Sequence, residues 1–224
     1  EEEKVVKEDY YDYIKYIEQY NTLLDSNNQR IKIGDFIKRK SKNFERLDLF
    51  EIEVTPAMKA KMAEEKALKE MNDYFEKGLK LYNGKGVNVD KKGAAQNLKN
   101  AADRGHVEAM IMYASMLSKG DGIPENKKEA AKYYKMAADK DKPEAMFNYG
   151  LMLYNGNGVS VDKKEAAKYY KKAADKGILN AMQNYALMLS KGDGIQANKK
   201  EAAKYYKMAA DNGHTNAMQN YALM

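Results

Sequence analysis

The stretch GLMLYNGNGVSVDKKEAAKYYKKAADKG, residues 150–177, contains the pattern that decides the fold. Two of its four glycines, Gly156 and Gly158, recur every 36 residues, and its alanine pairs keep the same interval. The equivalent glycines are Gly84 and Gly86, Gly120 and Gly122, and Gly192 and Gly194. A constant interval of this length is typical of a solenoid built from one repeated supersecondary unit. The sequence therefore predicts a repeat protein.

Each repeat predicts two helices joined by a glycine hinge. In the third copy the first helix is expected from about Glu144 to Tyr154, where apolar residues follow helical spacing. Glycine adopts positive φ at little cost, so the Gly-x-Gly hinge can turn the chain back. The second helix is expected to begin at the N-cap Asp162, with Glu165 at capping-box spacing. The predicted fold class is therefore all-α, with antiparallel helix pairs.

The ends of the second helices vary between copies. In the third copy the helix is expected to end at Gly177 in the left-handed conformation. The second copy has Asp141 and Pro143 there, and its helix is expected to stop through the proline instead. The first copy keeps Asp90 as the cap but has Gly93 in place of glutamate, so its second helix should begin less firmly. The methionines at one shared helical position are expected in the core: Met110, Met146, Met182 and Met218.

Read from Gly150 to Gly177, this order of glycine, alanine and tyrosine resembles the Sel-1-like repeat, a relative of the tetratricopeptide repeat. The resemblance implies helix pairs stacked into a right-handed superhelix with the first helices on its concave side, serving as an adaptor or scaffold. The chain departs from the family at Leu153, usually tyrosine, and at Tyr149, usually leucine. These exchanges bear on ligand preference and not on the fold. The absence of cysteine excludes the cysteine-rich secreted branch of the family.

The chain is predicted to divide near residue 55. Residues 1–55 comprise an amphipathic helix over 8–25 and a basic, partly irregular arm. Residues 56–224 form the solenoid, beginning with a long first helix over 56–82. The repeats are expected at about 72–107, 108–143, 144–179 and 180–215, with a partial repeat over 216–224. Because the sequence opens with Glu1 and stops partway through the pattern, it is expected to be part of a longer chain.

Several classes of site are excluded or disfavoured by composition and spacing. The chain has no cysteine, which excludes disulfides and thiolate sites and favours a reducing, cytoplasmic location. No run approaches the roughly 18 apolar residues of a membrane span. His106 and His214 follow helix-ending glycines without partners at ligand spacing, so they are interpreted as loop packing. The hinges lack the remaining residues of nucleotide-binding loops, and neither a metal nor a cofactor is predicted.

The resemblance places twelve residues of the first helices in a concave partner-binding groove. In chain order they are Phe75, Leu79 and Tyr82, then Ile111, Ser115 and Ser118, then Phe147, Leu151 and Tyr154, then Gln183, Leu187 and Ser190. The groove is expected to be apolar and aromatic around the first and third copies and more polar around the others. Exposed apolar surface of this kind usually marks a partner site. Alternatively, these residues pack against a neighbouring helix or lie under the N-terminal segment.

A short basic segment precedes the repeats. Between residues 30 and 46 it carries the possible contacts to an acidic partner: Lys38, Arg39, Lys40, Lys42 and Arg46. Such a segment could meet an acidic protein tail, a nuclear import receptor or nucleic acid. It lacks the interleaved aromatic residues of a single-strand binder, and it could equally be a solvated face.

The leading functional prediction is a non-catalytic scaffold or adaptor. It would hold a partner protein in the groove, with the N-terminal arm as a second contact, as a subunit of a larger assembly. One alternative is the regulatory or targeting repeat region of a longer enzyme such as a protein kinase, although no His-Arg-Asp or Asp-Phe-Gly motif occurs here. The other alternative is binding of nucleic acid or an acidic partner through residues 30–46.

Overall fold

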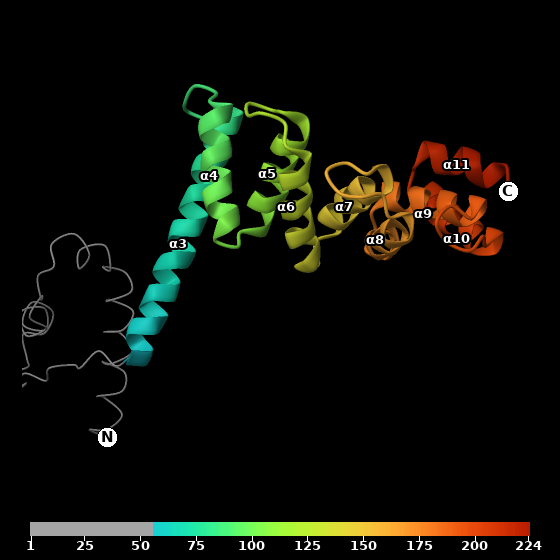
Figure 1. Cartoon of the computed structure of the whole chain (residues 1–224), viewed down its shortest axis with the longest axis horizontal. Helices are drawn as coiled ribbons and strands as arrows, with labels where there is room; N and C mark the ends of the chain where they lie inside the picture. Colours follow the sequence, from blue (N-terminus) through green and yellow to red (C-terminus); the bar gives the residue numbers. More distant parts are fainter. Residues whose placement is uncertain (1–55) are drawn as a thin grey trace, which may run out of the picture. The chain divides into compact units, whose positions relative to one another are not determined.

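A computed structural model describes residues 56–224 (Figure 1), and the predicted helix over 8–25 and the basic residues between 30 and 46 lie outside that range. The described part contains nine helices and no strand. They are α3 (Pro56–Asn83), α4 (Lys91–Asp103), α5 (Val107–Lys119), α6 (Lys127–Asp139), α7 (Pro143–Asn155), α8 (Lys163–Asp175), α9 (Leu179–Lys191), α10 (Lys199–Asp211) and α11 (Thr215–Ala222). Residues Ala57–Met224 form one compact unit.

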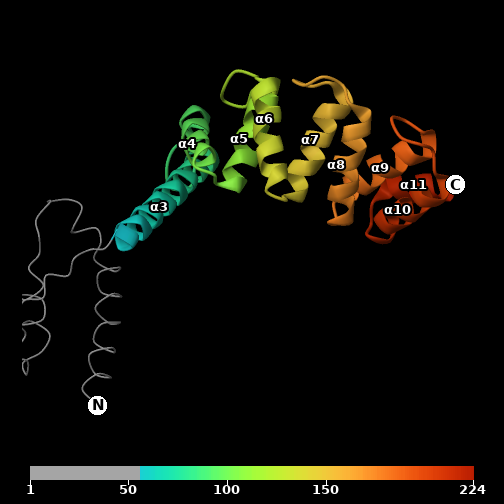
Figure 2. The same ribbon diagram turned by 60° about the horizontal axis from the view of Figure 1, so that its bottom comes forward.

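The helices of this unit pack in chain order. From α4 to α11 each helix contacts the next one along the chain, and Figure 2 shows the pairs following one another in a row. First helices (α3, α5, α7, α9) alternate with second helices (α4, α6, α8, α10). The predicted all-α stack of helix pairs with a 36-residue period is confirmed.

The two hinge glycines have different roles. The first, Gly156 in the third copy, ends α7 in the left-handed conformation with a φ of 72°. The second, Gly158, has a φ of 76°, and a Cβ atom there would overlap the backbone of Lys127 at the start of α6. The second glycine therefore also lets consecutive repeats approach closely, which the sequence pattern alone did not indicate.

The second helices begin as predicted. The side chain of Asp162 accepts a hydrogen bond from the backbone N–H of Glu165 over 2.9 Å, and Asp90 caps α4 through the N–H of Gly93 in the same way. The equivalent caps of α6 and α10 are Asn126 and Asn198. Because these caps satisfy backbone donors that the helix leaves free, they fix where each second helix starts.

The predicted proline stop in the second copy is wrong. Helix α6 ends at Asp139, and Asp141 adopts a φ of 67° where the third copy has Gly177 with a φ of 96°. Aspartate tolerates the left-handed conformation better than most residues, so the same turn forms without glycine. Pro143 is instead the first residue of α7, a position where its missing N–H carries no cost.

The core is made of small, aromatic and thioether side chains. Alanines with no exposed surface line the helix contacts, and tyrosines from the two helices of a repeat meet edge to face. These pairs are Tyr113–Tyr133, Tyr149–Tyr169 and Tyr185–Tyr205, with ring centroids 5.0, 4.9 and 5.0 Å apart. The prediction of core methionines is confirmed for Met110, Met146 and Met182 but is wrong for Met218, which is 45% exposed because no second helix covers that side of α11.

Candidate functional site

All twelve predicted groove residues lie on the first helices and are partly exposed. Phe75, Leu79 and Tyr82 lie on α3, Ile111, Ser115 and Ser118 on α5, Phe147, Leu151 and Tyr154 on α7, and Gln183, Leu187 and Ser190 on α9. We call these twelve residues the first-helix face. Six of them, Phe75, Tyr82, Ile111, Phe147, Leu151 and Tyr154, also pack against the core. Packing against a neighbouring helix, the alternative for these positions, therefore holds in part.

The first-helix face is uncharged over its third and fourth copies. Residues 145–161 and 177–190 contain no Asp, Glu, Lys or Arg. The second helices differ, since α6, α8 and α10 each begin with KKEAAKYYK, which carries four lysines and one glutamate. In the third and fourth copies the first helix therefore contributes an uncharged surface and the second helix a lysine-rich one.

The two tyrosines of this face hold the hinge of the next repeat. The Tyr82 hydroxyl donates a hydrogen bond to Asp121 over 2.8 Å, and the Tyr154 hydroxyl donates to Asp193 over 2.7 Å. Lys91 also binds Asp121, and this hydrogen bond, together with that of Tyr82, lowers the pKa of the Asp121 carboxyl. The hydroxyls are therefore engaged within the stack, and the rings are the part left for a partner.

The same cluster recurs in the third copy, and sequence reasoning missed both. Lys163 pairs with Asp193 over 2.7 Å and lowers the pKa of that carboxyl, with the Tyr154 hydrogen bond adding to the effect. The signal was present in the sequence, because tyrosine and serine alternate at Tyr82, Ser118, Tyr154 and Ser190. In step with them, aspartate stands between the two hinge glycines only in the second and fourth copies.

His106 contacts Phe75 of the first-helix face and also caps the N-terminus of α5. Its ring stacks on Phe75 with centroids 4.0 Å apart, and its Nδ1 accepts a hydrogen bond from the backbone N–H of Ala109, which makes His106 the N-cap of α5. Desolvation by burial lowers the pKa of His106, favouring the neutral imidazole that this cap needs. His214 caps α11 in the same way. The prediction of loop packing did not anticipate this capping role.

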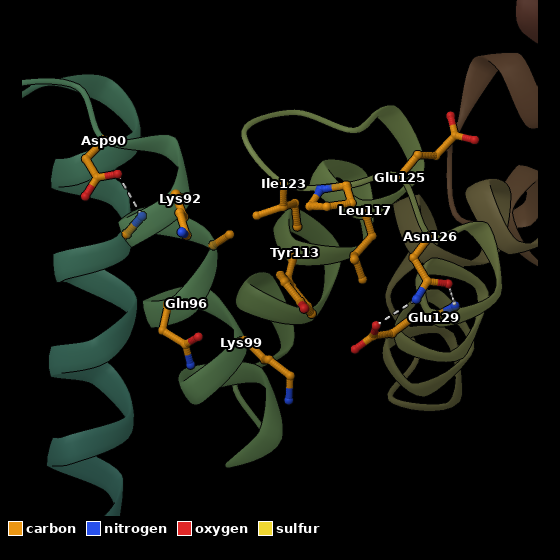
Figure 3. A pocket seen from close by; sticks show the side chains of 13 residues that line it. Asp90, Lys92, Gln96, Lys99, Tyr113, Leu117, Ile123, Glu125, Asn126 and Glu129 are labelled. Carbon is orange, nitrogen blue, oxygen red and sulfur yellow. Dashed lines mark hydrogen bonds between the residues drawn. The ribbon is translucent and has the colours of Figure 1, made fainter.

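A pocket of about 670 Å³ lies elsewhere, between α4, α5 and the hinge that leads into α6. Figure 3 shows Lys92, Gln96 and Lys99 facing Tyr113, Leu117 and Ile123 across it. A second pocket of about 420 Å³ lies at Leu179 and residues 213–216. Neither is lined by any of the twelve predicted residues. The first pocket was not predicted from the sequence. Gly93 and Gln96 stand where later copies have glutamate and lysine, and the exchange at Gly93 was interpreted only as a weaker helix start.

Within residues 56–224, no group of three or more His, Cys, Asp or Glu side chains could hold a metal ion. In the same part of the chain, no helix combines the length and apolar character needed to span a bilayer.

The chain is similar to known repeat proteins in both sequence and structure. The Sel1 repeat model matches residues 78–106, 107–142, 143–178 and 179–214. The structure is similar to that of a Sel1 repeat protein from Oxalobacter formigenes, with a TM-score of 0.66 and 28% identity over 74% of this chain and 68% of that one. It is also similar to c5321, a protective antigen of uropathogenic Escherichia coli strains with an SLR fold, with a TM-score of 0.64 and 29% identity over 70% of this chain. The match covers 34% of c5321, about a third of its length. No curated protein matches the chain.

Proposed function

Because this chain belongs to the Sel1 repeat family, we propose that it is a non-catalytic scaffold that holds a partner protein on its first-helix face. Sel1 repeats are generally protein-interaction scaffolds, and proteins built from them are typically non-catalytic. The finer part of the proposal concerns which surface of this chain takes the partner and what kind of partner segment that surface fits.

One observation supports the first-helix face most strongly. Over α7 and α9 it offers partly exposed Phe147, Leu151 and Leu187 without a charged residue between 145 and 161 or between 177 and 190. Charged residues are depleted and aromatic residues enriched in the central part of protein interfaces, so a face of this composition fits a partner better than open solvent. The lysine-rich starts of α6, α8 and α10 lack this character.

The partner segment should match the face in chemistry. It would offer apolar side chains to Phe147 and Leu151 and uncharged polar groups to the amide and hydroxyl groups of Gln183 and Ser190. Because residues 145–161 and 177–190 contain no charge that would offset the desolvation of a buried ionic group, a charged segment would bind this region less well.

Paired substitutions on neighbouring first helices test the proposal. Leu151→Glu combined with Leu187→Glu places a carboxylate on α7 and on α9. We expect proteins that co-purify with the wild-type chain from its native cells to be lost with this variant, because burying an unpaired carboxylate is costly. Mass spectrometry of the co-purified material gives the measurement.

Val161→Glu is the matched control, since Val161 is an apolar hinge residue that is 58% exposed and lies off the first-helix face. This variant should retain the same partners. Circular dichroism establishes that all variants keep their helices. Retention of every partner by the α7 and α9 variant, or equal loss with Val161→Glu, would contradict the assignment of the surface.

A further inference from the structure

The tyrosine-to-aspartate hydrogen bonds between successive repeats recur every 72 residues, although the helix packing recurs every 36. Two clusters joining a tyrosine, a lysine and an aspartate lie this far apart: Tyr82, Lys91 and Asp121 in one, and Tyr154, Lys163 and Asp193 in the other. We call each cluster a latch. The first connects the repeat α3–α4 to the repeat α5–α6, and the second connects α7–α8 to α9–α10.

A second type of contact follows the same alternation. The Tyr133 hydroxyl on α6 donates a hydrogen bond to Asp103 at the end of α4. The Tyr205 hydroxyl on α10 donates to Asp175 at the end of α8 over 2.6 Å. These bonds join the same two pairs of repeats as the latches do. Each pair of repeats is therefore connected at the hinge edge by its latch and at the opposite end of the second helices by a tyrosine.

The junction between α5–α6 and α7–α8 lacks both contacts. The latch positions hold Ser118 and Asn157 in place of tyrosine and aspartate, although Lys127 is present and pairs with Glu125 of its own hinge over 3.3 Å. Tyr169 and Asp139 occupy the places of the second contact. Among the described residues, no tyrosine hydroxyl donates to a carboxylate across this junction.

Exposed ion pairs occupy this junction instead. Lys142 pairs with Glu108, and Lys176 pairs with Asp141 over 2.6 Å, with all four side chains well exposed to solvent. Partly buried hydrogen bonds to a charged group stabilise more than exposed ion pairs do, and exposed pairs weaken further as salt screens them. The same helix packing is thus supported by weaker polar contacts at one junction than at its two neighbours.

We infer that the stack consists of two latched blocks, α3–α6 and α7–α10, and that the α6–α7 junction is a compliant seam between them. In a linear repeat array each repeat interacts only with its neighbours, so the weakest junction limits how far unfolding and refolding are coupled. The seam lies between Ser118 and Phe147 and divides the first-helix face into two halves. One half begins with Phe75, Leu79 and Tyr82, and the other with Phe147, Leu151 and Tyr154. The halves can then adjust to one another about the seam. This inference stands independently of the proposed function.

Urea unfolding with one reporter in each block tests the inference. Phe75→Trp and Phe147→Trp place the only tryptophan at equivalent positions 72 residues apart, because the chain has none of its own. The denaturant slope, or m-value, grows with the surface exposed in one cooperative step. If the blocks unfold separately, each reporter should show roughly half the m-value expected from the surface of the whole stack.

Grafting a latch onto the seam provides the decisive variant. Ser118→Tyr with Asn157→Asp supplies the missing hydroxyl and carboxylate beside Lys127, and we expect it to raise the m-value of both reporters about twofold and to make their midpoints coincide. Ser118→Phe with Asn157→Asp, which lacks only the hydroxyl, should leave the m-value low. Equal m-values in all three proteins would overturn the inference. If the grafted variant fails to fold by circular dichroism, coincident midpoints and a whole-stack m-value at both reporters in the proteins with the natural seam would overturn it equally.

Discussion

Residues 180–188 and 216–224 share the sequence NAMQNYALM but lie in different surroundings. Residues 180–188 belong to α9, which packs between α8 and α10. Residues 216–224 include most of α11, which packs against α10. Tyr185 is 8% exposed and Tyr221 is 40% exposed, while Met182 and Met218 are 5% and 45% exposed. Burial of a repeat's side chains is therefore supplied by the second helix that follows. The same substitution can therefore be made at two equivalent positions of the repeat that differ only in the residues around them.

Replacing the equivalent residues Tyr185 and Tyr221 should give the largest difference in the free energy of unfolding. Tyr185→Ala removes a ring that meets Tyr205 edge to face, and it should lower the free energy of unfolding by about 3 kcal/mol through lost burial and the cavity left behind. Tyr221→Ala should cost less than about 1 kcal/mol, because much of that ring already faces solvent. Urea titrations followed by circular dichroism measure both. Equal losses would break the comparison between α9 and α11.

The second hinge glycine gives the next largest effect. Gly86 and Gly158 have φ angles of 75° and 76°, but a Cβ at Gly86 would meet nothing within 4 Å, whereas at Gly158 it would overlap the backbone of Lys127. Gly86→Ala should therefore cost about 1 kcal/mol from the left-handed conformation alone. Gly158→Ala should cost about 3 kcal/mol, since overpacking adds to that strain. Thermal melts of the two variants side by side decide the point, and a larger loss at Gly86 would refute it.

Restoring the missing glutamate of the first copy should have a smaller, stabilising effect. Gly93→Glu gives α4 the same start as α6, α8 and α10, and replacing glycine in a helix should raise the free energy of unfolding by about 0.5–1 kcal/mol. Urea titration measures the change. Gly93→Ala serves as the control, because it supplies the helix propensity without the carboxylate. A destabilised Gly93→Glu protein would show that the carboxylate of Asp90, which lies close to any Cβ at this position, cannot move aside.

The smallest expected effect is a pH dependence from the cap of α5. Burial lowers the pKa of His106 below 6.5, so the unfolded chain takes up this proton more readily than the folded one. Stability should be complete above about pH 6.5 and should fall as the pH drops through the folded pKa, since a protonated imidazole cannot accept the Ala109 hydrogen bond. Comparing urea midpoints at several pH values with those of His106→Asn, which keeps a capping oxygen, checks this. An identical pH dependence in both proteins would contradict it.

Local features of the fold could be predicted from the sequence. The caps Asp162 and Asn198 and the left-handed Gly177 each depend on residues within a few positions, so the local sequence contained them. The 36-residue period is read directly from the recurring glycines. The end of α6 was predicted wrongly because Asp141 can adopt the glycine conformation and Pro143 suits the first turn of α7, a choice that the dipeptide signals did not resolve.

Contacts between repeats were harder to predict. Tyr154 and Asp193 are 39 residues apart, and their meeting depends on how one repeat stacks on the next. The alternation of tyrosine with serine was visible in the sequence, but its meaning appears only once the stack is built. For the candidate site, the sequence predicted twelve positions that lie on first helices and stay partly exposed. Their use by a partner is still a prediction, because part-exposure alone does not identify an occupant.

The edge-to-face tyrosine pairs have an optical consequence. Tyr113–Tyr133, Tyr149–Tyr169 and Tyr185–Tyr205 place three near-identical chromophore pairs at successive levels of a chain without tryptophan. Near-ultraviolet signals from the natural protein therefore average over all levels and cannot distinguish them. A single indole substituted into one pair would emit against a background of tyrosine alone, so each level of the stack can be observed separately by spectroscopy.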